Sequence, residues 1–77
     1  MNNPRRKQLK KAMELLAEAR AIIEQAQEEE QESFDNMPEG IQYSERGEQV
    51  EENASRLEEV ASYIEEQENE LDEIING

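Results

Sequence analysis

A seven-residue repeat fills the second half of the chain and restricts its fold more than any other feature. From Glu51 the sequence reads Glu-Glu-Asn-Ala-Ser-Arg-Leu, Glu-Glu-Val-Ala-Ser-Tyr-Ile, Glu-Glu-Gln-Glu-Asn-Glu-Leu and Asp-Glu-Ile-Ile. A strict apolar repeat of this period keeps one seam facing a partner helix only if the helices supercoil. The pattern therefore predicts a coiled-coil-like helix over about 44–75, with Ser44 as its N-cap. One heptad position holds Val50, Leu57, Ile64 and Leu71, and we expect support from Ala54, Val60, Ala61, Ile74 and Ile75, with Tyr63 covering the edge of the core.

Apolar residues in the first half also follow helical spacing, which predicts a helix over about 4–33. Pro4 suits a first helical turn, and Asn2 or Asn3 can cap it from in front. High charge and few aromatic residues are also typical of disordered chains. The regular three- and four-residue steps argue against disorder, because a solvated tail has no reason to keep them. These residues are Leu9, Ala12, Met13, Leu15, Leu16, Ala19, Ile22, Ile23 and Ala26.

Between the two helices, a connector over about 34–43 breaks the periodicity with residues that favour turns, Pro38 and Gly40 among them. It is nevertheless rich in apolar side chains, so we expect a packed connection with a short helical turn. Gly47 either lets another helix approach closely or only weakens the first turn of the second helix. The connector residues that either bind a partner or, the favoured interpretation, pack inward are Phe34, Met37, Ile41, Tyr43 and Arg46.

Charge is distributed unevenly along the 77 residues, which carry a net charge of −13. Arg5, Arg6, Lys7, Lys10, Lys11 and Arg20 lie in the first 20 residues, opposed there only by Glu14 and Glu18. Basic residues at the amino end of a helix oppose its macrodipole. An antiparallel hairpin would compensate by placing this basic segment beside the acidic end of the second helix, around Glu65, Glu66, Glu70, Asp72 and Glu73.

The chain is too short to bury a large core by itself. It contains no cysteine and no histidine, so disulfides and common zinc sites cannot supply the missing stability. We therefore expect one all-α domain over residues 1–77, an antiparallel two-helix hairpin that completes a four-helix bundle as a homodimer. Docking of the same apolar face onto another protein is the alternative.

Several functions are disfavoured by these residue types. The serines have no histidine to activate them, and a carboxylate pair on a solvated helix lacks the desolvated cleft that separates pKa values. We expect no enzyme activity, no cofactor and no metal site. The acidic balance disfavours direct binding to nucleic acid, and no apolar run approaches the roughly 18 residues that span a bilayer, so we expect no membrane contact.

An acidic pair recurs every seven residues along the second helix. Such pairs lie about 10.5 Å apart, or one charge per roughly 5 Å, against one per about 1.7 Å in duplex DNA. The pattern could imitate a nucleic acid or simply be the solvated outside of a coiled coil. We name this set the acidic stripe: Glu51, Glu52, Glu58, Glu59, Glu65, Glu66, Asp72 and Glu73.

The connector also carries a resemblance. The stretch Ser33-Phe-Asp-Asn-Met-Pro-Glu-Gly-Ile-Gln-Tyr-Ser-Glu-Arg-Gly-Glu48, followed by Glu-rich heptads, resembles small acidic helical proteins of phages and prophages that have no established activity. The resemblance implies a setting in the cytoplasm of an infected or lysogenic bacterium. Our leading hypothesis is a non-enzymatic protein that binds and modulates or inhibits a host defence protein. The alternatives are an acidic nucleic-acid mimic and a structural assembly component.

Overall fold

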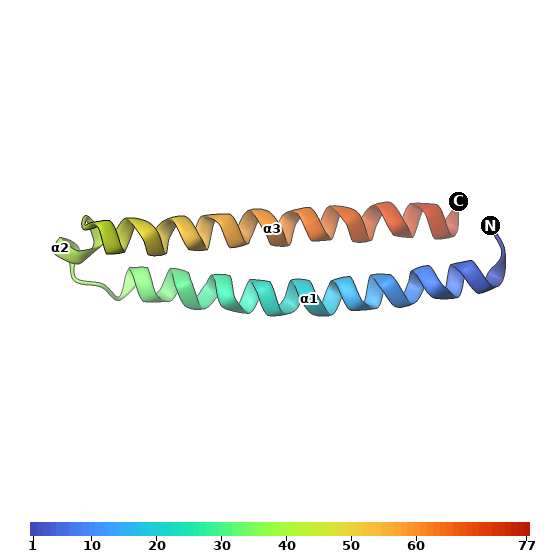
Figure 1. The fold of residues 1–77 in the computed structure, drawn as a ribbon, viewed down its shortest axis with the longest axis horizontal. Coiled ribbons are helices and arrows are strands. Elements are labelled where there is room, and N and C mark those ends of the chain that lie inside the picture. The colour runs from blue at the N-terminus through green and yellow to red at the C-terminus, as the bar shows by residue number, and fades with distance from the viewer.

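The computed structural model describes all residues 1–77 and shows an extended helical hairpin. Helix α1 (Asn3–Asp35) and helix α3 (Glu45–Asn76) run antiparallel, and the short helix α2 (Glu39–Gln42) lies at the turn. In Figure 1 the two long helices lie side by side over their whole length, and both termini are at the end opposite α2. The Cα atoms extend 58 × 15 × 13 Å. The predicted all-helical hairpin is thus confirmed.

Both long helices begin at side-chain caps. The Asn2 Oδ1 accepts a hydrogen bond from the Arg5 backbone N–H at 2.9 Å, and Pro4 lies in the first turn, where its missing N–H costs nothing. The Ser44 Oγ accepts from the Gly47 N–H at 3.4 Å. Helix α1 continues two residues beyond the expected end at Ser33. The glutamates at 28–32 are good helix formers, so they sustain the helix into its last turn.

The seam of α3 follows two lines of seven-residue spacing. One line holds the four buried residues of the whole chain, Gly47, Ala54, Ala61 and Ile75. The other line holds the half-buried side chains Val50, Leu57, Ile64 and Leu71. Small residues on the first line let the two helix backbones approach each other, while the larger ones fill the space beside them. Helix α1 has no fully buried residue, so the core is thin.

Three side chains of α3 that the sequence suggested for the core or its edge are exposed instead. Val60 is 46% exposed and Ile74 is 45% exposed, so neither belongs to the buried core as the sequence suggested. Tyr63 is 62% exposed and lies among Glu59 and Glu66 on the outside of α3. It does not cover the edge of the core, because one residue along a helix turns the side chain about 100° away from Ile64.

A polar pair interrupts the apolar seam between Ala61 and Ile75 of α3. The Arg20 Nε donates to the Glu68 Oε2 at 2.6 Å and the Arg20 Nη2 to the Glu68 Oε1 at 3.4 Å, a forked contact between α1 and α3. The Arg20 Nη1 also donates to Glu24 at 2.9 Å. Hydrogen bonds to Glu68 and Glu24 raise the pKa of Arg20 above its ordinary value. Glu68 lies seven residues from both Ala61 and Ile75, so this pair fixes the register of the seam.

Arg20 and Glu68 form the one ion pair between the helices. The expected contacts of the basic segment with Glu65, Glu66, Glu70, Asp72 and Glu73 are not formed. Lys11 pairs only within its own helix, with Glu14 at 3.7 Å, and the Arg6 Nε is buried without a hydrogen-bond partner. The hairpin therefore leaves most of its basic segment without an opposite charge in contact.

Neither long helix contains an apolar stretch of sufficient length to cross a lipid bilayer.

Candidate protein-binding surfaces

The connector is held by a set of hydrogen bonds. The Asn36 N–H donates to the Glu32 carbonyl at 3.0 Å and closes the end of α1. The Gln42 Nε2 donates to the Phe34 carbonyl at 3.0 Å, which ties α2 back to α1. The Ser44 Oγ donates to the Ile41 carbonyl in addition to capping α3. The segment is therefore an ordered turn with defined side-chain directions.

Gly47 permits the close packing of this turn on α3. A Cβ atom at this position would lie 2.7 Å from the Gln42 carbonyl carbon and closer still to the carbonyl oxygens of Ile41 and Gln42. Real Cβ atoms do not approach backbone so closely, so the turn would have to move. The structure favours the close-approach interpretation of Gly47, and the element that approaches is the backbone at the end of α2.

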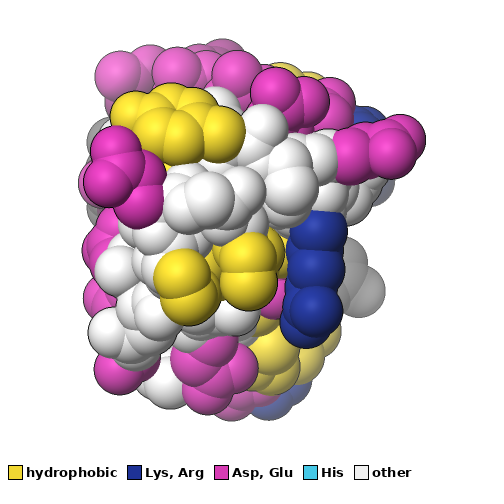
Figure 2. Space-filling model, turned by 90° about the vertical axis from the view of Figure 1, so that its left-hand side faces the viewer, with side chains coloured by type: hydrophobic (Ala, Val, Ile, Leu, Met, Phe, Trp, Pro, Cys, Tyr) yellow, Lys and Arg dark blue, Asp and Glu magenta, His cyan; other side chains and the backbone are white.

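Side chains of the connector divide into two groups. Phe34 and Met37, at the turn end of the hairpin, are half-buried. Ile41 is 42% exposed and Tyr43 is 78% exposed. Figure 2 views the molecule from this end and shows hydrophobic side chains at the surface among acidic ones, with basic side chains at one edge. We name the exposed group the connector tip: Ile41, Tyr43 and Arg46.

A second apolar surface runs along one side of the hairpin. Ile22 is 71% exposed, and Leu15 lies two helical turns before it on the same side of α1. Ala26 lies one turn after Ile22 and lines a groove together with Val60 of α3. Two heptads after Val60, Ile74 continues this surface along α3. We name the set the lateral face: Leu15, Ile22, Val60 and Ile74, with the groove at Ala26 and Leu57.

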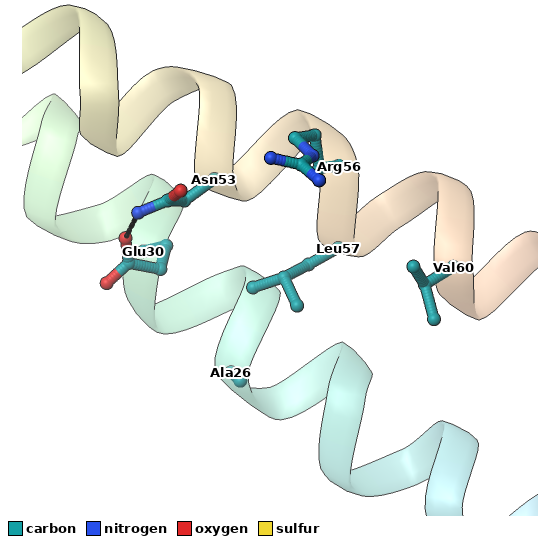
Figure 3. Close-up of a pocket in the computed structure, with 6 residues that line it drawn as sticks. All are labelled: Ala26, Glu30, Asn53, Arg56, Leu57 and Val60. Carbon is teal, nitrogen blue, oxygen red and sulfur yellow. Dashed lines mark hydrogen bonds between the residues drawn. The ribbon is translucent and has the colours of Figure 1, made fainter.

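The groove of the lateral face lies between α1 and α3 and is shown in Figure 3. Leu57 extends from α3 into the space beside Ala26, and Val60 follows one turn later. The Asn53 Nδ2 donates to the Glu30 Oε2 at 3.5 Å and bounds one end of the groove. Arg56 lies on its rim. The groove thus joins apolar side chains of both helices into one surface.

All eight residues of the acidic stripe are exposed, and none forms an ion pair. Ser55 and Ser62 lie between them in shallow depressions on the outside of α3. No three acidic side chains come together in a way that could hold a metal ion. The stripe is therefore a row of solvated carboxylates directed away from α1.

The sequence pointed to five connector residues, of which the structure exposes Ile41, Tyr43 and Arg46. It did not separate Leu15, Ile22, Val60 and Ile74 from the other apolar residues of the two helices, so the lateral face was missed. The signal was present, since Leu15 and Ile22 lie one residue before Leu16 and Ile23, a second apolar line that one partner helix cannot cover. No protein family model matches this chain, and neither a curated protein nor a solved structure shows significant similarity to it.

Proposed function

We propose that this chain is a non-enzymatic protein-binding module whose connector tip contacts a partner protein. The observation that carries the proposal is the exposure of Tyr43, at 78%, on a turn fixed by hydrogen bonds from Gln42 and Ser44. Tyrosine is enriched among the residues that dominate binding energy at interfaces. A side chain already held on an ordered turn loses less conformational entropy on binding than one on a mobile loop.

The class of partner is taken from the resemblance of residues 33–48 to phage and prophage proteins. We propose a host protein in the cytoplasm of an infected or lysogenic bacterium, whose activity the hairpin modulates or inhibits. Ile41 supplies an apolar contact beside Tyr43, and Arg46 supplies a positive charge between Glu45 and Glu48. A partner site that suits this tip is an apolar pocket with a carboxylate at its rim. We also propose that the module acts as a homodimer.

Affinity purification from bacterial lysate, with mass spectrometry of the captured proteins, tests the tip. The chain with Tyr43→Ala or Ile41→Ala is expected to lose the captured protein, while Tyr63→Ala is expected to retain it. Tyr63 is a matched control because it is the other exposed tyrosine and lies on the outside of α3. Capture that survives both tip substitutions would refute the proposal.

The alternative function, an acidic mimic of nucleic acid, is favoured by the exposed and unpaired acidic stripe. In this case the partner would be a basic nucleic-acid-binding site, and binding would depend strongly on salt. Substituting Glu58, Glu59, Glu65 and Glu66 by glutamine is expected to abolish capture if the stripe binds, and to leave it unchanged if the tip binds. The two proposals therefore predict opposite results from the same variant.

A further inference from the structure

The lateral face has few charged residues although the chain is highly charged. Charged residues make up 38% of the sequence. Between Ala12 and Ala26 the side of α1 next to the groove carries only Ala12, Leu15, Ala19, Ile22 and Ala26. The facing side of α3 carries Asn53, Val60, Gln67 and Ile74, and the charged residues that line the groove are Arg56 on its rim and Glu30 at one end. Carboxylates are instead collected on the outer and opposite sides, as expected of a molecule whose lateral face is covered.

The amount of exposed surface fits the same conclusion. A compact monomeric protein of 9.0 kDa has an accessible surface of about 4,850 Å² by the usual size scaling, whereas this hairpin has 5877 Å². The excess, on the order of 1,000 Å², is comparable to the roughly 800 Å² that each partner buries in a stable interface. One long side of the hairpin, 58 by 15 Å, has the area needed for such an interface.

Charge indicates which molecule covers the face. Residues 1–35 carry six basic and eight acidic side chains, a net charge of −2, whereas residues 36–77 carry two basic and thirteen acidic ones, a net charge of −11. Packing α3 against α3 of another copy would bring together the two most acidic segments. Packing α3 against α1 of another copy avoids this repulsion, and it places the unpaired basic segment of α1 beside the acidic last turns of α3.

We propose that a second copy of this chain covers the lateral face, with the two-fold axis along the hairpin, so that each α3 lies against α1 of the other copy. All four neighbouring helix pairs are then antiparallel, as in a four-helix bundle. This inference deepens the proposed function and rests on it in one respect. Because the axis runs lengthwise, both connector tips lie at the same end, and the partner protein meets a composite surface with two copies of Tyr43.

Size-exclusion chromatography with light scattering tests the interface. The wild-type chain is expected to elute as a dimer of about 18 kDa, twice the mass of one chain. Ile22→Glu places a charge at the centre of the lateral face and is expected to give a monomer. Ala21→Glu is the matched control: Ala21 is exposed on the neighbouring side of α1 and the substitution adds the same charge, so this variant is expected to stay dimeric.

Helicity, measured by circular dichroism, separates loss of the interface from loss of the fold. Ile22 is mostly exposed in the hairpin, so Ile22→Glu is expected to retain a helical spectrum. A wild-type chain that stays monomeric at millimolar concentration would overturn the proposal. An Ile22→Glu variant that dimerises as well as Ala21→Glu would also overturn it. So would a monomeric wild-type chain that captures a different protein and loses that protein on Ile22→Glu, because the lateral face would then bind another protein and not a second copy.

The direction of the axis is tested by one spin label per chain. The sequence has no cysteine, and a side chain at Gly40 would meet no atom within 4 Å, so Gly40→Cys introduces a single label at the turn. Neighbouring helices in a bundle are about 8–10 Å apart, so the two labels are expected within roughly 30 Å of each other. A separation near the 58 Å length of the hairpin would overturn the lengthwise axis.

Failure of this inference and failure of the proposed function give different results. Tyr43→Ala lies outside the lateral face and is expected to leave the dimer intact while it removes partner capture. If Ile22→Glu is monomeric and still captures the partner as strongly as wild type, the composite surface is refuted and the single-tip function stands.

Discussion

Replacing Gly47 by alanine tests how the connector is held, because the structure and helix propensity predict opposite signs. In a helix, alanine is usually more stable than glycine by about 0.5–1 kcal/mol. Here the added Cβ would lie 2.7 Å from the Gln42 carbonyl carbon and against two carbonyl oxygens. These are backbone atoms, which cannot rotate away as the end of a side chain can. Overpacking of this kind costs about 1–3 kcal/mol, so we expect a net loss of about 1–2 kcal/mol for Gly47→Ala.

The assay is thermal unfolding followed by circular dichroism at one fixed chain concentration. A loss of this size corresponds to a fall in Tm of about 4–16 °C for a domain of 60–100 residues. Gly40→Ala is the matched control, since a Cβ at Gly40 meets nothing within 4 Å, and its Tm is expected to stay equal or rise slightly. If Gly47→Ala behaves like Gly40→Ala, the turn is not packed on α3 as described.

Three further predictions concern the seam and the interface. Ala54 is 1% exposed, so Ala54→Leu should destabilise the fold by about 1–3 kcal/mol in chemical denaturation, while Ser55→Leu on the exposed neighbour should change little. Glu68→Gln, which removes the carboxylate that Arg20 holds across the seam, should lower Tm, whereas Glu70→Gln should not; equal effects would contradict a register role for this pair. Raising sodium chloride from about 0.05 to 0.5 M screens the net repulsion between two chains of charge −13 and should tighten the dimer in analytical ultracentrifugation; a weaker dimer would show that attraction between α1 of one copy and α3 of the other exceeds this repulsion.

The helices themselves could be predicted from the sequence, because their signals are local. Ser44 caps α3, and the heptad line through Val50 and Ile64 faces α1, as the repeat indicated. Side-chain caps act over three residues and a heptad acts over two turns. Neither the caps nor the heptads depend on residues far away in the chain, so the sequence alone is sufficient to predict the helices.

Contacts between helices were harder to predict, because they depend on register. Arg20 and Glu68 are 48 residues apart, and the sequence offers Arg20 many other carboxylates on α3. Only the packing of small residues such as Ala61 against α1 selects among them. Likewise, the division of the connector into inward Phe34 and outward Tyr43 depends on how closely the turn approaches Gly47, which is a three-dimensional property.

Thermal unfolding at several chain concentrations tests most directly whether two thinly packed helices depend on a second copy. We measure the circular dichroism spectrum and Tm from micromolar to millimolar chain. We expect a strongly helical spectrum and a cooperative transition whose Tm rises with concentration, because association stabilises the folded state by mass action. A coil spectrum would contradict the hairpin, and a Tm that does not change with concentration would contradict the proposed role of the lateral face.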